Sequence, residues 1–275
     1  MEKLYCLTRS RVLIPVITSL LFIPHVQASS ATEATPRLDK IKQRGELRVC
    51  IWPEYFSISY KNQKNGELQG IDIDLAKSFA NELGVKPRFV KTHFGRFMDD
   101  LERDACDIGM FGIGRTAARM QRIDFSQPYL ASDMYGLTTK THTAINRWSD
   151  MDKPDNVVCV QKGTYMEGEM RKQLKHAELS VVAKPHEREI EVRSGRADVF
   201  ITDYPYGQKM LKNYDWAKLL PPENQSGQKF EYAYAVAKKQ PQWLERVDTF
   251  VASIKNDGRL RKYAAKHDLT PIVLD

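Results

Sequence analysis

The stretch Asp107-Ile-Gly-Met-Phe-Gly-Ile-Gly-Arg-Thr-Ala-Ala-Arg119 joins an apolar run to a segment of small residues that ends in an arginine. The apolar run, residues 107–111, predicts a buried strand. The strand therefore ends where Gly112 and Gly114 offer free backbone amides and Arg119 offers a guanidinium. Such groups together form a receptor for a carboxylate. The stretch predicts that the protein binds a small acid.

Strand and helix patterns alternate on both sides of this stretch. The first unit has the order strand, helix, strand, helix, strand over residues 47–51, 73–83, 88–91, 97–103 and 107–111. The same order recurs over residues 156–160, 164–174, 179–182, 187–194 and 199–202. Alternation of this kind is typical of an open, mostly parallel α/β sheet flanked by helices. Two such units predict two similar lobes.

Two extended segments, residues 133–140 and 230–237, follow the two units and predict two crossings between the lobes. Helices expected at 243–255 and 260–266 would then close the first lobe. The predicted organisation is a first lobe of residues 37–135 and 234–275, a second lobe of residues 138–230, and hinges near 135–138 and 230–234. Ligands of open α/β sheets bind at the carboxyl ends of strands. The cleft between the lobes is therefore the expected site.

The N-terminus has the pattern of a secretory signal peptide. A basic segment, residues 3–11, precedes an apolar run, residues 12–23, and Val26-Gln-Ala28 fits the small-residue cleavage pattern. The apolar run is too short to span a bilayer comfortably. We expect residues 1–28 to be removed and the mature chain to be exported to the periplasm. No cysteine stands at the cleavage point, so a lipid anchor is not expected.

Charge and histidine patterns exclude several classes of function. The 275-residue chain has 42 Lys and Arg against 35 Asp and Glu, a formal net charge of +7. The two signs are interleaved, and no basic run or basic-aromatic stripe tracks a nucleic-acid backbone. The histidines do not cluster with cysteines or carboxylates at ligand spacing. We expect no nucleic-acid partner, no metal site and no cofactor.

Three cysteines remain after the predicted cleavage: Cys50, Cys106 and Cys159. Each lies in or beside an apolar, strand-like run, and none belongs to a CxxC motif. Buried unpaired thiols are the favoured interpretation. A Cys50–Cys106 disulfide is the alternative in an oxidising compartment, and spacing alone does not decide between them.

The order and spacing of several motifs resemble the family 3 bacterial solute-binding proteins, which are type II periplasmic binding proteins and polar amino-acid receptors of ABC transporters. The resemblance covers residues 38–268. It rests on Leu47-Arg-Val49, Gly66 to Ala76, Phe94, Asp107 to Tyr129, Gly163-Thr164, Gly195-Arg-Ala-Asp198, Asp203 and Asp257-Gly258. No single motif decides it.

The resemblance implies roles for individual residues. Arg119 matches the arginine that clamps a ligand α-carboxylate, and Gly112 and Gly114 match positions that line the same pocket. Asp203 matches the carboxylate that pairs with the ligand α-ammonium. Simpler alternatives stay open: Arg119 as a surface arginine, and Asp203 as a helix N-cap before Pro205.

Further positions match the walls of the pocket. Thr164 begins a helix and has capping-box spacing from Glu167, and this structural role is enough to explain a threonine here. In the functional alternative, the free amides at the start of the helix would also face the ligand carboxylate. Tyr55 and Phe94 match the aromatic residues that sandwich the ligand side chain. Ordinary packing is the alternative for both.

The chain departs from the best-known relatives at several pocket positions. Trp52 stands where receptors for basic amino acids carry an acid, and Tyr165 stands where many relatives carry a second threonine. Phe111 and Gly114 replace small hydroxyl residues of the wall. Arg115 adds a nearby positive charge or simply faces solvent. These departures favour a neutral, aromatic or acidic ligand over a cationic one.

The expected function is that of a periplasmic receptor that closes on a small acid and delivers it to a membrane permease. We expect the protein to be a monomer without enzyme activity. The rival is a cyclohexadienyl dehydratase-like enzyme on the same fold. That group carries a glutamate soon after the Thr-Asp that ends the second-lobe strand. Here Thr202-Asp203 precedes Tyr204-Pro-Tyr-Gly207, which has no carboxylate. A receptor that docks to a signalling partner is the third alternative.

Overall fold

The computed structural model describes residues 1–2, 37–223 and 229–275. Apart from its first two residues, the predicted signal peptide therefore lies outside the described residues. The described strands form two large sheets and one small sheet. The small sheet consists of β2 (Glu54–Tyr55), β3 (Ser59–Lys61) and β4 (Leu68–Gln69).

The first large sheet has the strand order β5-β1-β6-β14-β7, with β8 pairing to β14. Its strands are β1 (Glu46–Ile51), β5 (Lys86–Lys91), β6 (Ile108–Gly114), β7 (Ile123–Phe125), β8 (Leu130–Ser132) and β14 (Phe230–Ala237). Strand β1 runs parallel to β5 and β6. Strand β14 runs antiparallel to β6, β7 and β8. We call this sheet and the helices on it the first lobe.

The second large sheet has the order β11-β10-β12-β9-β13. Its strands are β9 (Met134–Thr139), β10 (Val157–Gln161), β11 (Glu178–Val182), β12 (Val199–Asp203) and β13 (Ala217–Leu220). Strand β10 runs parallel to β11 and β12, whereas β9 runs antiparallel to β12 and β13. This sheet and its helices form the second lobe.

Two details differ from the sequence prediction. The sheets are mixed rather than mostly parallel, because the strands that enter after each crossing, β9 and β14, pair antiparallel. The chain also changes sheets earlier than expected. It does so between Ser132 and Met134 and again between Leu220 and Phe230, so the predicted hinges at 135–138 and 230–234 fall within β9 and β14.

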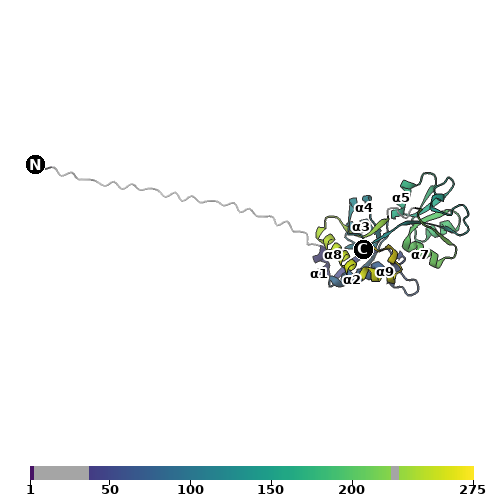
Figure 1. The fold of residues 1–275 in the computed structure, drawn as a ribbon. Coiled ribbons are helices and arrows are strands. Elements are labelled where there is room, and N and C mark those ends of the chain that lie inside the picture. The colour runs from purple at the N-terminus through teal and green to yellow at the C-terminus, as the bar shows by residue number, and fades with distance from the viewer. Residues whose placement is uncertain (3–36, 224–228) are drawn as a thin grey trace. The chain divides into compact units, whose positions relative to one another are not determined.

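The helices cover the sheets, as Figure 1 shows. They are α1 (Arg37–Arg44), α2 (Ile71–Glu82), α3 (Phe97–Glu102), α4 (Ala117–Arg122), α5 (Tyr165–Gln173), α6 (Glu187–Arg193), α7 (Tyr204–Asn213), α8 (Pro241–Asn256) and α9 (Arg259–Lys266). Short 3₁₀ turns occupy Trp148–Asp150 and Thr270–Ile272. The C-terminal helices return to the first lobe, where α8 contacts α1 and α9 contacts α2.

Helix α2 shows why these residues fold this way. Ile73, Ala76, Phe79 and Ala80 recur at helical spacing, and all four are fully buried. Phe79 stacks on Phe250 of α8, with ring centroids 4.4 Å apart. Burying a large apolar side chain contributes roughly 1.5–3 kcal/mol, so this face fixes α2 and α8 on the first lobe.

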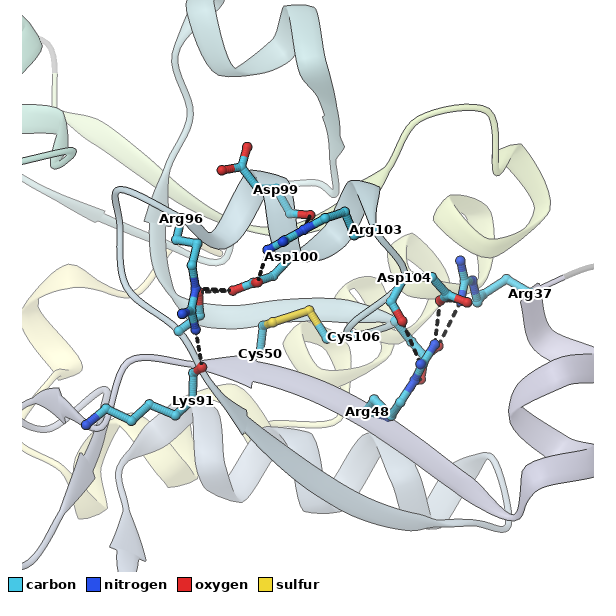
Figure 2. Close-up of a disulfide and its surroundings, with 12 residues drawn as sticks. Arg37, Arg48, Cys50, Lys91, Arg96, Asp99, Asp100, Arg103, Asp104 and Cys106 are labelled. Carbon is cyan, nitrogen blue, oxygen red and sulfur yellow. Dashed lines mark hydrogen bonds and ion pairs between the residues drawn. A yellow bond between two sulfur atoms is a disulfide. The ribbon is translucent and has the colours of Figure 1, made fainter.

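A disulfide joins Cys50 at the end of β1 to Cys106, just before β6 (Figure 2). The favoured prediction of unpaired thiols is therefore wrong for these two residues, and the disulfide alternative is confirmed. Strands β1 and β6 are parallel neighbours, and the Cα atoms of the two cysteines lie 5.6 Å apart. Cys159 in β10 is a buried free thiol, as predicted. Within residues 37–223 and 229–275, no helix is both long and apolar enough to cross a bilayer.

Candidate ligand-binding site

A cavity lies between residues of the two lobes. Eight of the nine residues predicted for the site line it: Trp52, Tyr55, Phe94, Gly112, Gly114, Thr164, Tyr165 and Asp203. The ninth, Arg119, lies beside the cavity rather than on its wall. Strand ends position the walls, because Trp52 follows β1, Gly114 ends β6 and Asp203 ends β12. The cavity therefore lies at the carboxyl ends of parallel strands, where open α/β sheets bind ligands.

Asp203 connects the two lobes at the cavity. Its side chain is 3% exposed, and its Oδ2 accepts hydrogen bonds from the hydroxyls of Tyr55 and Tyr232, the latter at 2.6 Å. Its Oδ1 accepts the backbone N–H of Tyr206 at 3.2 Å, which caps α7. The helix-cap alternative is thus confirmed, and the same carboxylate faces the cavity. Since an ionised carboxylate has about four acceptor sites, Oδ1 can still accept one more donor.

Burial controls the charge of Asp203. Loss of solvent raises the pKa of this carboxyl, and the hydrogen bonds from Tyr232, Tyr55 and the Tyr206 amide oppose that rise. A cationic donor at Oδ1 would favour the ionised form further. The site is therefore suited to an ammonium group.

Arg119 is a buried cation held by backbone carbonyls. It is 6% exposed, its Nη1 donates to the Gly114 carbonyl at 2.5 Å, and its Nη2 donates to the Gly163 carbonyl at 2.7 Å. The bond to Gly163 joins the first lobe to the second. Its Cζ lies 5.7 Å from the Phe94 ring centroid. Burial lowers the pKa of Arg119 to about 10, so the group stays charged at neutral pH.

No carboxylate oxygen of the described residues lies within 4.0 Å of an Arg119 nitrogen. A buried cation without an ionic partner is unfavourable unless an anion or several hydrogen bonds compensate it. Arg119 stands directly behind two cavity residues, Gly114 and Phe94. A carboxylate reaching this side of the cavity would supply the missing charge.

Gly112 serves the site differently from the prediction. Its backbone N–H donates to Asp72 Oδ2 at 2.8 Å, so the expected free amide is wrong at this position. Its φ of +61° is a left-handed conformation that favours glycine. A Cβ here would lie 2.9 Å from Cε1 of Tyr55. Gly112 therefore leaves room for the Tyr55 ring in the cavity wall.

The Asp72 carboxyl that holds Gly112 makes folding stability depend on pH. Burial raises its pKa to about 7, although bonds from the Tyr129 hydroxyl, the Gly112 amide and the Tyr234 hydroxyl oppose the shift. Between about pH 4 and 7 the unfolded chain loses this proton while the folded chain keeps it. The contribution of Asp72 to stability therefore falls across that window, by up to about 4 kcal/mol, and is level above it.

Asp72→Asn should remove this dependence. The uncharged amide keeps an acceptor for the Gly112 N–H, so we expect the variant to gain stability relative to the parent as pH rises from 5 to 8. Urea unfolding at both pH values measures the gain. Parallel stability profiles of parent and variant would show that Asp72 does not titrate in this window.

Thr164 lies on the cavity wall but lacks the predicted capping box. Its Oγ1 donates to the Gln161 carbonyl at 2.7 Å, and no backbone amide donates to it. Glu167 instead accepts the backbone N–H of Gly163 at 2.6 Å. Glu167 thus bonds the amide of Gly163, one residue before the amide of Thr164 that a capping box would use. The reason is Gly163, whose φ of +78° bends the chain there.

Aromatic rings form most of the remaining wall. Trp52, Tyr55 and Phe94 contact one another with centroids 5.4–5.9 Å apart. Tyr165 of the second lobe stacks on Phe230 of β14, with centroids 4.4 Å apart and planes 14° apart. These contacts make the wall rigid and largely apolar.

Two predicted pocket features are not on the wall. Phe111 is fully buried and packs behind Phe94, with centroids 5.1 Å apart, because β6 is buried along its whole length. Arg115 pairs with Glu231 at 2.8 Å on a partly exposed surface. The solvent-facing alternative for Arg115 therefore fits the structure better than a ligand role.

Six wall residues were not predicted from the sequence. They are Met166, Arg188, Thr202, Tyr206, Phe230 and Tyr232. Thr202 is the last residue of the predicted strand 199–202, so its position at a strand end was an available signal. Tyr232 lies within the predicted extended segment 230–237. Arg188 and Tyr206 belong to short helices whose sequence is typical of a charged or irregular surface.

Comparison with known proteins agrees with this geometry. Residues 47–269 match the family of bacterial extracellular solute-binding proteins, family 3. Similar curated proteins include cyclohexadienyl dehydratase of Pseudomonas aeruginosa, 29% identical over 68% of this chain and 70% of that protein. Another is the amino-acid-binding protein AabA of Dichelobacter nodosus, 28% identical over 76% of this chain and 82% of that protein.

Solved structures show the same fold. The ancestral amino acid-binding protein AncCDT-1, a precursor of cyclohexadienyl dehydratase, superposes with a TM-score of 0.77 at 34% identity and covers 84% of this chain and 98% of its own. The substrate-binding protein AbpA of Streptococcus pneumoniae, bound to L-arginine, gives 0.75 at 26% identity, covering 83% and 97%. Two lobes with a cavity between them are thus the type II periplasmic-binding arrangement. The chain belongs to family 3 of the bacterial extracellular solute-binding proteins.

Proposed function

We propose that this chain is the periplasmic binding component of an ABC transporter and that it closes on a small carboxylate-bearing solute, an amino acid. Arg119 would bind the α-carboxylate and Asp203 the α-ammonium. The aromatic wall of Trp52, Tyr55 and Phe94 would contact the side chain. Relatives described as amino-acid-binding proteins support this choice of ligand class.

The observation that carries the proposal is a pair of buried opposite charges on the two lobes beside one cavity. Arg119 comes from α4 of the first lobe and Asp203 from β12 of the second. Neither has a buried ion-pair partner among the described residues. A zwitterion would pair with both, and each pair attracts by roughly 4 kcal/mol at an effective dielectric near 20. Binding would therefore favour closure of the lobes.

The proposed compartment rests on two features. The N-terminal sequence predicts a cleaved signal peptide, and the Cys50–Cys106 disulfide is typical of a protein that folds in an oxidising compartment. Both features fit the periplasm and delivery of the solute to a membrane permease.

A dehydratase is the second candidate, because one relative is cyclohexadienyl dehydratase. That reaction requires a general acid in the cleft. Asp203 is the one carboxylate on the wall among the described residues, and it already accepts three hydrogen bonds. Glu167 accepts the Gly163 amide and pairs with Arg171. These contacts favour binding over catalysis.

The experiment is a thermal-shift screen of the purified mature protein against the twenty amino acids, small dicarboxylates, prephenate and arogenate. A ligand at a hundred times its Kd should stabilise the protein by about 2.7 kcal/mol. We expect at least one amino acid to raise the Tm. No shift with any amino acid would contradict the proposed ligand class. Phenylpyruvate or phenylalanine formed from the last two compounds would identify an enzyme.

A further inference from the structure

We infer that Arg188 is a specificity-determining residue that binds a second carboxylate on the ligand, so that the preferred solute is an acidic amino acid. The inference rests on the proposed function, because it assumes that Arg119 and Asp203 bind the α-carboxylate and α-ammonium. It adds a third charge to the cavity, from a residue outside the predicted site.

Arg188 has unused hydrogen-bonding capacity at the cavity wall. It lines the cavity and is 6% exposed. Only its Nη1 has a hydrogen-bond partner among the described residues, the Ile201 carbonyl at 2.9 Å. Its Nε is buried without a partner. A guanidinium has five N–H donors, and the bond to the Ile201 carbonyl does not use them all.

The Arg188 guanidinium is held in place by aromatic rings rather than by an acid. Its Cζ lies 5.0 Å from the centroid of Phe200 and 4.7 Å from that of Tyr206. No carboxylate oxygen of the described residues comes within 4.0 Å of its nitrogens. The rings pack against the guanidinium, and the edge of such a group binds a carboxylate in bidentate fashion.

Charged groups of both signs surround Arg188. Lys209 Nζ lies 4.6 Å from the Tyr206 ring centroid, so two cations contact this ring. The nearest acid on the same helix, Glu189, accepts the Tyr206 hydroxyl and has His186 Nδ1 at 3.2 Å. Arg188 also opposes the rise in the pKa of Asp203, and both acids already accept hydrogen bonds from other groups.

The charge balance of the cavity then selects the ligand. A zwitterion would pair with Arg119 and Asp203 and would leave Arg188 without a direct ion-pair partner among the described residues. A second carboxylate would complete the balance, whereas a cationic side chain would meet like charge in a desolvated site. This chain should thus differ from the relative whose structure holds L-arginine.

Isothermal titration of the mature protein with L-glutamate, L-aspartate, L-glutamine, L-asparagine, L-arginine, succinate and glutarate tests the inference. We expect at least one acidic amino acid to bind tenfold or more tightly than its amide, with L-arginine weaker still. Arg188→Gln should remove that preference, lowering affinity for the acid at least tenfold and for the amide less than threefold. Arg188→Lys should retain part of the preference and shows that the site still folds.

Arg193→Gln is the matched control, because it removes an exposed arginine from the same helix. It should leave every affinity unchanged. Tight binding of neutral or cationic amino acids, with no acid preference, would overturn the inference while supporting the proposed function. Arg188-dependent binding of succinate or glutarate without any amino acid would contradict both the amino-acid ligand and the preferred solute, although Arg188 would still bind a carboxylate. An acid preference that survives Arg188→Gln, or no binding by any compound, also contradicts the inference.

Discussion

Arg119→Ala is expected to weaken binding of the amino-acid ligand by at least about a hundredfold. Truncating one partner of a buried, hydrogen-bonded charge pair typically costs 2–5 kcal/mol, and a hundredfold corresponds to about 2.7 kcal/mol. The variant loses the cation beside Gly114 and Phe94. It also loses the bond to the Gly163 carbonyl, which joins the lobes. Both losses destabilise the closed, liganded state.

Two further variants separate charge from geometry in this prediction. Arg119→Lys keeps the charge but not the planar fork that spans two carbonyls, so we expect an intermediate affinity. Arg115→Ala removes a neighbouring arginine whose partner, Glu231, lies on the surface, and should bind normally. Titration with the ligand found in the screen measures all three. Affinity of Arg119→Ala within threefold of the parent would show that this arginine is purely structural.

Local sequence patterns predicted most of the fold, because periodicity and helix stops report local structure directly. The helix predicted from apolar spacing over residues 73–83 is an example, because α2 begins two residues earlier and ends one residue earlier. The sequence suggested helix α7 only through the alternative of Asp203 as an N-cap before Pro205, and it gave no bounds for the helix. In the structure Pro205 occupies the first turn, where its missing N–H costs nothing.

The motif resemblance predicted eight wall residues but not the contacts that decide what they do. The Gly112 amide is taken by Asp72, forty residues away, and Arg188 is buried by packing on Phe200 and Tyr206. These partners meet only when each lobe folds, so no local pattern contains them. The same reason left the Cys50–Cys106 pairing undecided, because it depends on β1 and β6 being neighbours.

The disulfide should be the largest single contribution to the stability of the first lobe. It closes a loop across a sequence separation of 56 residues, and a loop of that length corresponds to about 4 kcal/mol in the chain-entropy description. For a chain of this size, 4 kcal/mol lowers the Tm by roughly 10 °C. We therefore expect dithiothreitol, or the Cys50→Ala, Cys106→Ala double variant, to lower the Tm by about that amount.

The neighbouring ion pairs should keep the first lobe folded when the disulfide is reduced. Asp104 and Asp107 are bridged by Arg37 and Arg48 close to Cys106 (Figure 2). They hold β1 against the start of β6 without the covalent link, so the reduced protein should still fold at room temperature. The double variant supplies the control, since its Tm should not respond to dithiothreitol. Thiol titration of the denatured mature protein should give one free cysteine before reduction and three after it. Three free thiols before reduction, or equal Tm values with and without dithiothreitol in the parent, would contradict the pairing and with it one of the two arguments for an oxidising compartment.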